Sequence, residues 1–84
     1  MLKKVVVKNQ WGIHASVATA LCELSMRYKG HMFIKYGKKT ASIRYISQTL
    51  GLGVRCGEEI IIIADGDDEA KAMDEAIAII QYTQ

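Results

Sequence analysis

The segment Gly12-Ile13-His14-Ala15-Ser16 places a histidine directly before the first predicted helix, residues 16–28. This helix has no acidic residue before Glu23, so its first backbone amides meet no local carboxylate. Free amides at a helix N-terminus attract anions, because the helix dipole leaves partial positive charge there. A histidine at this position can hold a phosphoryl group against those amides. These residues alone leave two interpretations of His14, an ordinary surface histidine and a group that binds a phosphoryl group.

The second long predicted helix, residues 67–82, begins in a different environment. The segment Asp65-Gly66-Asp67-Asp68-Glu69 surrounds its N-terminus with carboxylates. We expect these side chains to cap the free amides and to complement the helix dipole. Only the first long helix is then predicted to have a vacant N-terminus.

Hydrophobic periodicity predicts the elements that position these helices. Alternation indicates strands over residues 3–8, 31–36 and 40–43, with a turn at Gly37-Lys38 between the last two. The β-branched run 60–64 predicts a central strand, and residues 46–50 a short helix. We expect Ser16 or Ala15 to cap the first long helix and Gly30 to end it in a left-handed conformation. The predicted buried stripes of the two long helices are Val17, Ala20, Leu21, Leu24 and Tyr28, and Met73, Ala76, Ile77 and Ile80.

This order of elements predicts one α+β domain over residues 1–84. A four-stranded antiparallel sheet is expected to be covered on one face by two long helices and one short helix. The other face is left open. We expect Val6, Phe33, Ile61 and Ile63 there, which are apolar for a solvated surface and predict self-association or another protein contact.

Composition narrows the functional classes. Residues 1–44 hold nine Lys or Arg against one acid, and residues 45–84 hold two against eight, behind a net charge of +2. This asymmetry fits an acidic protein partner at least as well as a nucleic acid, because no nucleic-acid motif accompanies the lysines. The longest apolar run, residues 60–64, is too short to cross a bilayer, and the N-terminus lacks the pattern of a signal peptide. We therefore expect a cytoplasmic protein that does not bind a membrane.

The cysteines and histidines predict no metal site. Cys22 and Cys56 lack metal-ligand spacing, and Cys22 is expected to be a small buried thiol within the first helix. Neither a disulfide nor a cofactor is predicted. An enzyme with its own turnover is the least supported class, because no second titratable group stands near His14 in the sequence.

Several segments, spread over nearly the whole chain, carry a family resemblance: Gly12-Ile13-His14-Ala15, Ala18-Thr19, Leu52-Gly53-Val54, Glu59-Ile60 and Ala64-Asp65-Gly66. They resemble HPr, the histidine phosphocarrier family of the bacterial sugar phosphotransferase system. The resemblance implies an HPr-like open-faced β-sandwich. It also implies that His14 accepts a phosphoryl group on Nδ1 from enzyme I, charged by phosphoenolpyruvate, and passes it to a IIA unit of a sugar permease.

The resemblance assigns further roles around His14. The backbone amides of Ser16 and Val17 would bind the phosphoryl group. Trp11 is either a partly buried anchor of the loop or a contact residue at the rim of the site. Partners would dock on a surface made of Trp11, Thr19, Ala20, Glu23, Arg27, Arg44, Ile46, Ser47 and Leu50, where Ala20 has an alternative role in the core.

Two departures from the family pattern leave a second function open. Ser16-Val17 stands where the family has Arg-Pro, and the lost charge-assisted hydrogen bond is worth about 1.5 to 3 kcal/mol. Tyr45 stands where some members carry a regulatory serine, with Ser42 and Ser47 out of place, so we expect no phosphorylation by the serine kinase. The alternative is an HPr-like regulatory or binding protein with weak or no phosphotransfer, and a basic nucleic-acid-binding domain is less well supported.

Overall fold

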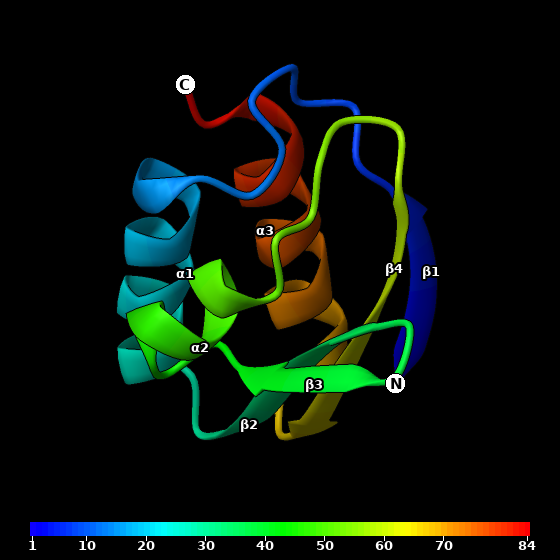
Figure 1. Ribbon diagram of the computed structural model, residues 1–84. Coiled ribbons are helices and arrows are strands. Elements are labelled where there is room, and N and C mark those ends of the chain that lie inside the picture. The colour runs from blue at the N-terminus through cyan, green and yellow to red at the C-terminus, as the bar shows by residue number, and fades with distance from the viewer.

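A computed structural model describes all residues, 1–84. The elements follow the predicted order of strand, helix, strand, strand, short helix, strand and helix (Figure 1). Their bounds are β1 Leu2–Val6, α1 Ala15–Arg27, β2 Gly30–Tyr36, β3 Lys39–Ser42, α2 Ile46–Gly51, β4 Glu59–Gly66 and α3 Glu69–Tyr82. The expected α+β class is confirmed.

The four strands form one antiparallel sheet in the order β1-β4-β2-β3. β4 lies between two neighbours, as its β-branched sequence predicted. Ile60 of β4 is opposite Val5 of β1, and Ile62 is opposite Ile34 of β2. Because side chains alternate along a strand, Ile60 and Ile62 point to the same face, where both are fully buried.

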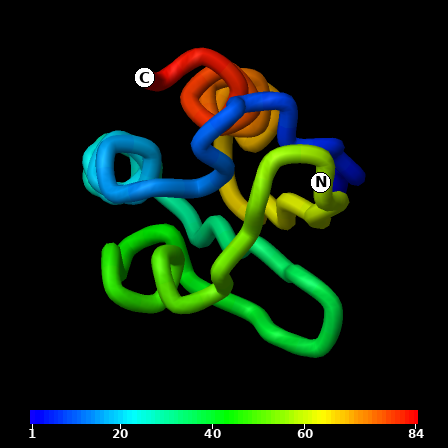
Figure 2. Tube along the Cα trace, turned by 45° about the horizontal axis from the view of Figure 1, so that its top comes forward, coloured from blue at the N-terminus to red at the C-terminus, as the bar shows by residue number.

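The helices cover only one face of this sheet, and the core lies between the two layers (Figure 2). Leu21 and Leu24 of α1 and Met73 and Ile80 of α3 are fully buried there, as the predicted stripes require. The opposite face is open, as expected: Phe33, Ile61 and Ile63 are half-buried and Val6 is 44% exposed. Self-association through this face stays a prediction.

Both ends of α1 differ from the prediction. The helix begins at Ala15, and His14 itself is the N-cap residue, with extended backbone and no capping side-chain bond. The expected caps Ser16 and Ala15 already lie inside the helix. At the other end, Gly30 is not left-handed but opens β2, where a β-carbon would collide with the carbonyl oxygen of Asp65. Gly30 is thus required by the close approach of β2 to β4.

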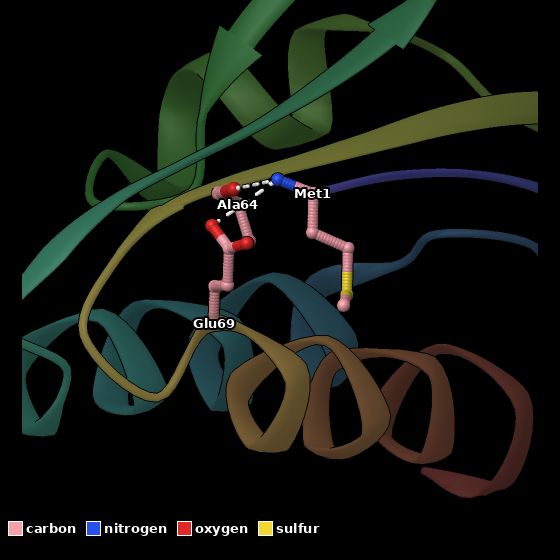
Figure 3. A network of polar contacts seen from close by, with 3 residues as sticks. All are labelled: Met1, Ala64 and Glu69. Atoms are coloured by element: carbon pink, nitrogen blue, oxygen red, sulfur yellow. Dashed lines mark hydrogen bonds and ion pairs between the residues drawn. The ribbon is translucent and has the colours of Figure 1, made fainter.

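The start of α3 also differs from the prediction. Asp68 is its N-cap residue and adopts a left-handed conformation with φ of 57°, but its carboxylate caps no amide. Glu69, in the first turn, accepts instead from the amino group of Met1 at 3.1 Å. The same amino group donates to the carbonyl oxygen of Ala64 at 2.7 Å (Figure 3). The acidic segment therefore joins β1, β4 and α3, a role that the sequence did not indicate.

None of the helices has both the length and the apolar character that crossing a bilayer requires.

The two cysteines lie outside the core. Cys22 is half-buried rather than buried, and its Sγ donates to the carbonyl oxygen of Arg44 at 3.2 Å, which links α1 to the segment before α2. Cys56 is exposed, and both thiols are free.

Candidate functional site

His14 lies at the exact junction between the loop that follows β1 and the first turn of α1. Its carbonyl oxygen accepts the first helical hydrogen bond, from the amide of Ala18 at 3.0 Å. Its backbone is extended, with φ of −106° and ψ of −176°, so its side chain stands at the N-terminal end of the helix. The first turn of α1 contains no acidic residue. The structure thus places an imidazole beside a helix N-terminus without a competing carboxylate.

The two ring nitrogens of His14 have different surroundings. Nδ1 lies 3.4 Å from the carbonyl oxygen of Gly12, longer than the usual 2.9 to 3.0 Å of an N–H···O bond. Nε2 has no hydrogen-bond partner and no appreciable exposed surface. Since the ring as a whole is only half-buried, the edge that carries Nε2 is the enclosed one.

The first amides of α1 form the second part of the site. The backbone amides of Ala15, Ser16 and Val17 donate to no carbonyl oxygen and to no side chain. Ala15 and Ser16 are exposed, whereas Val17 has no exposed surface. Of the two residues whose amides are expected to bind phosphate, Ser16 is therefore exposed, whereas Val17 and its amide are enclosed in this conformation.

The loop before His14 is packed tightly against the segment after α2. Gly12 has φ of 65°, and a β-carbon there would overlap the carbonyl oxygen of Val54 and lie 2.9 Å from Cα of Arg55. The amide of Ile13 donates to that same carbonyl oxygen of Val54 at 3.1 Å. Ile13 itself is 5% exposed. A glycine is thus required two residues before the histidine by both conformation and space.

The segment that Gly12 contacts is itself held in place by Glu58. Its carboxylate accepts a hydrogen bond from the hydroxyl of Tyr36, on β2, and another from the amide of Arg55 at 2.8 Å. These two bonds hold the pKa of Glu58 below its ordinary value, the Tyr36 bond contributing most. The same bond to Glu58 raises the pKa of Tyr36. The sheet therefore supports the site indirectly, through Glu58.

Asn9, in the loop between β1 and α1, is a residue of the site that the sequence did not indicate. It is only 5% exposed. Its carbonyl oxygen accepts from the amide of Gly12 at 2.9 Å, which closes a four-residue turn. Asparagine at the first position and glycine at the fourth is a common turn pattern, so the turn was predictable. The side chain of Asn9 also contacts the C-terminal end of α3, which the sequence did not predict.

The surface expected to dock partners is largely exposed. Ile46 and Leu50 of α2 are each 38% exposed, and Ala20 is half-buried. Trp11 is 64% exposed, so its interpretation as a partly buried anchor is wrong. Tyr45, the N-cap residue of α2, is 54% exposed. The other expected docking residues are all exposed: Thr19, Glu23, Arg27, Arg44 and Ser47.

The two arginines of that surface lie in different places. Arg44 precedes α2, which packs beside α1 (Figure 1), and its carbonyl oxygen contacts Cys22. Arg27 lies in the last turn of α1, about 20 Å from His14 at the helical rise of about 1.5 Å per residue. Its Nη1 is 3.3 Å from a carboxylate oxygen of Glu75 on α3. Arg27 therefore belongs to the contact between the two long helices, not to the surroundings of His14.

A surface cavity of about 470 Å³ lies at this far end of α1 and does not include His14. Its lining residues come from α1, the turn after it and the start of α3: Leu24, Arg27, Tyr28, Lys29, Asp67, Asp68, Lys71, Ala72 and Glu75. The hydroxyl of Tyr28 has no partner and no exposed surface, and burial raises the pKa of Tyr28. No group of three His, Cys, Asp or Glu side chains is arranged to hold a metal ion.

Comparisons with known proteins agree with this arrangement. The family model of the PTS HPr component phosphorylation site matches residues 1–82. A phosphocarrier protein HPr from Bacillus anthracis is 26% identical, with 96% of each chain covered and a TM-score of 0.88. HPr-C-His from Thermoanaerobacter tengcongensis is 24% identical over 95% of this chain and 90% of that chain, with a TM-score of 0.86, and shows the same fold.

A third structure is the catabolite repression containing protein Crh of Bacillus subtilis. It is 27% identical over 93% of this chain and 90% of that chain, with a TM-score of 0.74, and is described as a dimer with a swapped domain. The family match covers nearly the whole chain, including the loop with His14. The chain therefore belongs to the HPr family, the phosphocarrier component of the phosphotransferase system.

Proposed function

We propose that this protein carries a phosphoryl group on Nδ1 of His14, accepts it from phosphorylated enzyme I and passes it to a IIA unit of a sugar permease. The observation that carries the proposal is the position of His14 as the N-cap residue of α1, beside amides that make no other hydrogen bond. A helix N-terminus of this kind stabilises a doubly charged phosphoryl group. Membership of the HPr family supports partners among the proteins of the phosphotransferase system, and enzyme I and a IIA unit are the ones that we propose.

The surroundings of the ring favour Nδ1 as the reacting atom. Nε2 has no appreciable exposed surface, so a second protein cannot reach it in this conformation. Nδ1 needs a free lone pair for attack, so the reactive tautomer carries its proton on Nε2. The new N–P bond forms as the bond between phosphorus and the donor breaks, and the donor keeps that electron pair. The ring proton stays on Nε2 throughout.

The carbonyl oxygen of Gly12 limits how the phosphorylated ring can lie. It faces Nδ1 at 3.4 Å and would repel the phosphoryl oxygens. We therefore expect the ring to turn away from Gly12 once it is phosphorylated, toward the amides of Ala15 and Ser16, which make no hydrogen bond. The hydroxyl of Ser16 can add one neutral donor, which is weaker than the guanidinium that the family pattern supplies.

Partners would dock around His14 on α1 and α2. Ile46 and Leu50 provide exposed apolar anchors, and Arg44 provides a charge that attracts acidic partners. Trp11 adds an exposed aromatic side chain from the loop. Arg27, at the C-terminal end of α1, is exposed and pairs with Glu75 of α3, so it would lie at the edge of this docking surface rather than beside His14.

A specific observation favours a second function, that of a regulatory or binding protein that transfers phosphate weakly or not at all. Ser16 is exposed at the place where the family has a cation, so the site lacks a fixed positive side chain. The similarity to Crh, whose description refers to catabolite repression, also supports a regulatory function.

One experiment separates the two functions. The protein is incubated with enzyme I and phosphoenolpyruvate, and acid-labile phosphate is measured on the wild type, on His14→Ala and on Ser16→Arg. Phosphate on the wild type that is lost in His14→Ala supports the carrier. No phosphate on the wild type, with phosphate on Ser16→Arg, supports the regulatory protein instead.

A further inference from the structure

The side chain of Asn9 joins the loop that carries His14 to the C-terminal turn of α3. Its Nδ2 donates to the carbonyl oxygen of Ile80 at 3.3 Å and to that of Thr83 at 2.6 Å. Its Oδ1 accepts from the amide of Trp11 at 3.1 Å. Nitrogen faces two acceptors and oxygen faces one donor, so only one orientation of the carboxamide satisfies all three contacts.

Each of these hydrogen bonds pairs a backbone group that makes no hydrogen bond within a helix or strand. The last carbonyl groups of a helix have no helical partner, and Ile80 lies in the last turn of α3. The amide of Trp11 lies inside the turn that the carbonyl oxygen of Asn9 closes with Gly12. The contact with Ile80 is buried and the other two are partly buried, so loss of these hydrogen bonds would leave polar groups unpaired. Asn9 therefore fixes the turn both internally and against a helix.

This turn sets the position of His14. Gly12 is its last residue, and the carbonyl oxygen of Gly12 is the group that faces Nδ1 of the histidine. Ile13 follows, held by Val54. A change in the orientation of the Gly12 peptide group therefore acts on the ring of His14 directly.

We propose that Asn9 is a positioning residue for His14: its buried carboxamide fixes the Asn9–Gly12 turn on the end of α3 and so sets the placement of the imidazole at the start of α1. The proposal rests on the proposed function only for its effect on phosphoryl transfer. The effect on the ring itself is independent of any partner.

Gln81 offers a matched control. Its Nε2 donates to the carbonyl oxygen of Val6 at 2.8 Å, and its Oε1 accepts from the amide of Lys8 at 2.8 Å. It thus joins the same helix end to the same stretch of chain with a side-chain amide. It contacts the residues before the turn and none of those between the turn and His14. A purely structural anchor should behave like Gln81.

The test compares Asn9→Ala with Gln81→Ala by three measurements: the melting temperature, the ¹⁵N chemical shifts of the His14 ring, and the rate of phosphoryl acceptance from enzyme I. Both variants should melt at lower temperature. Asn9→Ala should also shift both ring resonances and slow acceptance on the order of 10- to 100-fold, the usual cost of misplacing a reacting group by about 1 Å. Gln81→Ala should leave the ring resonances in place and the rate within about twofold.

Several outcomes would overturn the proposal. The proposal is wrong if Asn9→Ala melts like Gln81→Ala and leaves the ring resonances of His14 unchanged. It is also wrong if Asn9→Ala shifts the ring resonances without slowing phosphoryl acceptance. If Asn9→Ala does not fold, the same measurements are made on Asn9→Asp, which keeps the acceptor for Trp11 and loses the donors to α3. If the wild type accepts no phosphate, the proposed function fails, while the ring resonances still decide whether Asn9 positions His14.

Discussion

Replacing Ser16 with arginine should raise the rate at which His14 accepts a phosphoryl group. Ser16 is exposed and is the second residue of α1, so a longer side chain meets no packed neighbour. Its own amide makes no hydrogen bond and lies at the helix start, where the phosphoryl group is expected. A guanidinium from this position can reach the phosphoryl oxygens while the amide still donates to them.

The gain follows from two opposing terms. A hydrogen bond from a charged donor contributes about 1.5 to 3 kcal/mol, and ordering an exposed arginine costs on the order of 1 to 2 kcal/mol. With the middle of each range, about 0.8 kcal/mol remains, which corresponds to a gain of about three- to fourfold. Stability should change in the opposite direction. A cation in the first turn opposes the helix dipole by about 0.3 to 1 kcal/mol, a fall in melting temperature of about 1 to 8 °C.

The assay is the initial rate of phosphate transfer from enzyme I, measured beside thermal unfolding. Ser16→Gln is the control for side-chain length without charge, and Ser16→Lys for charge without the planar guanidinium. The rate should rank arginine first, then lysine, then glutamine. Equal rates for the arginine and glutamine variants would refute the argument that the missing cation limits the site, and a higher melting temperature for Ser16→Arg would refute the argument from the helix dipole.

Three further predictions concern the surroundings of the site. Gly12→Ala should lower the free energy of unfolding in urea by at least about 2 kcal/mol, from the left-handed backbone and the overlap with Val54; a smaller loss would mean that the loop shifts freely. The bond between Tyr36 and Glu58 lowers the pKa of Glu58 and raises that of Tyr36, so its stabilisation is complete between about pH 4.3 and pH 10 and is lost as pH falls through the lowered pKa or rises through the raised one. Tyr36→Phe should therefore be less stable than wild type at pH 7, with a smaller difference at pH 2, and an equal difference at both would contradict this linkage. Ser47 should not be phosphorylated by an HPr serine kinase and ATP, and phosphoserine at Ser47 in a mass spectrum would contradict that expectation.

The fold was predictable because burial on one side leaves a periodic record in the sequence. Alternation along β2 and the three- to four-residue spacing along α1 and α3 reflect the same core from different elements. The order of the strands within the sheet leaves no such record.

The ends of the helices were less predictable than their positions. Ser16 or Ala15 was expected to cap α1, but the N-cap residue with extended backbone is His14, one or two residues earlier.

The site was predictable only where its chemistry is local in sequence. His14, the glycine before it and the absence of acid in the first turn all lie within one short segment. Asn9 and Gln81 act through hydrogen bonds to residues more than 70 positions away in the chain, which depend on how α3 packs against the end of β1. The amino group of Met1 reaches Glu69 in the same way. Contacts of this range follow from topology, which periodicity alone does not specify.

The central claim is that Nδ1 of His14 carries the phosphoryl group beside the first amides of α1. The most direct test is NMR of the protein labelled with ¹⁵N and phosphorylated by enzyme I and phosphoenolpyruvate. We expect a ³¹P coupling to Nδ1 of His14 and a marked downfield shift of the amide proton of Ser16. A coupling to Nε2, a phosphate on another residue, or an unshifted Ser16 amide in the phosphorylated protein would contradict it.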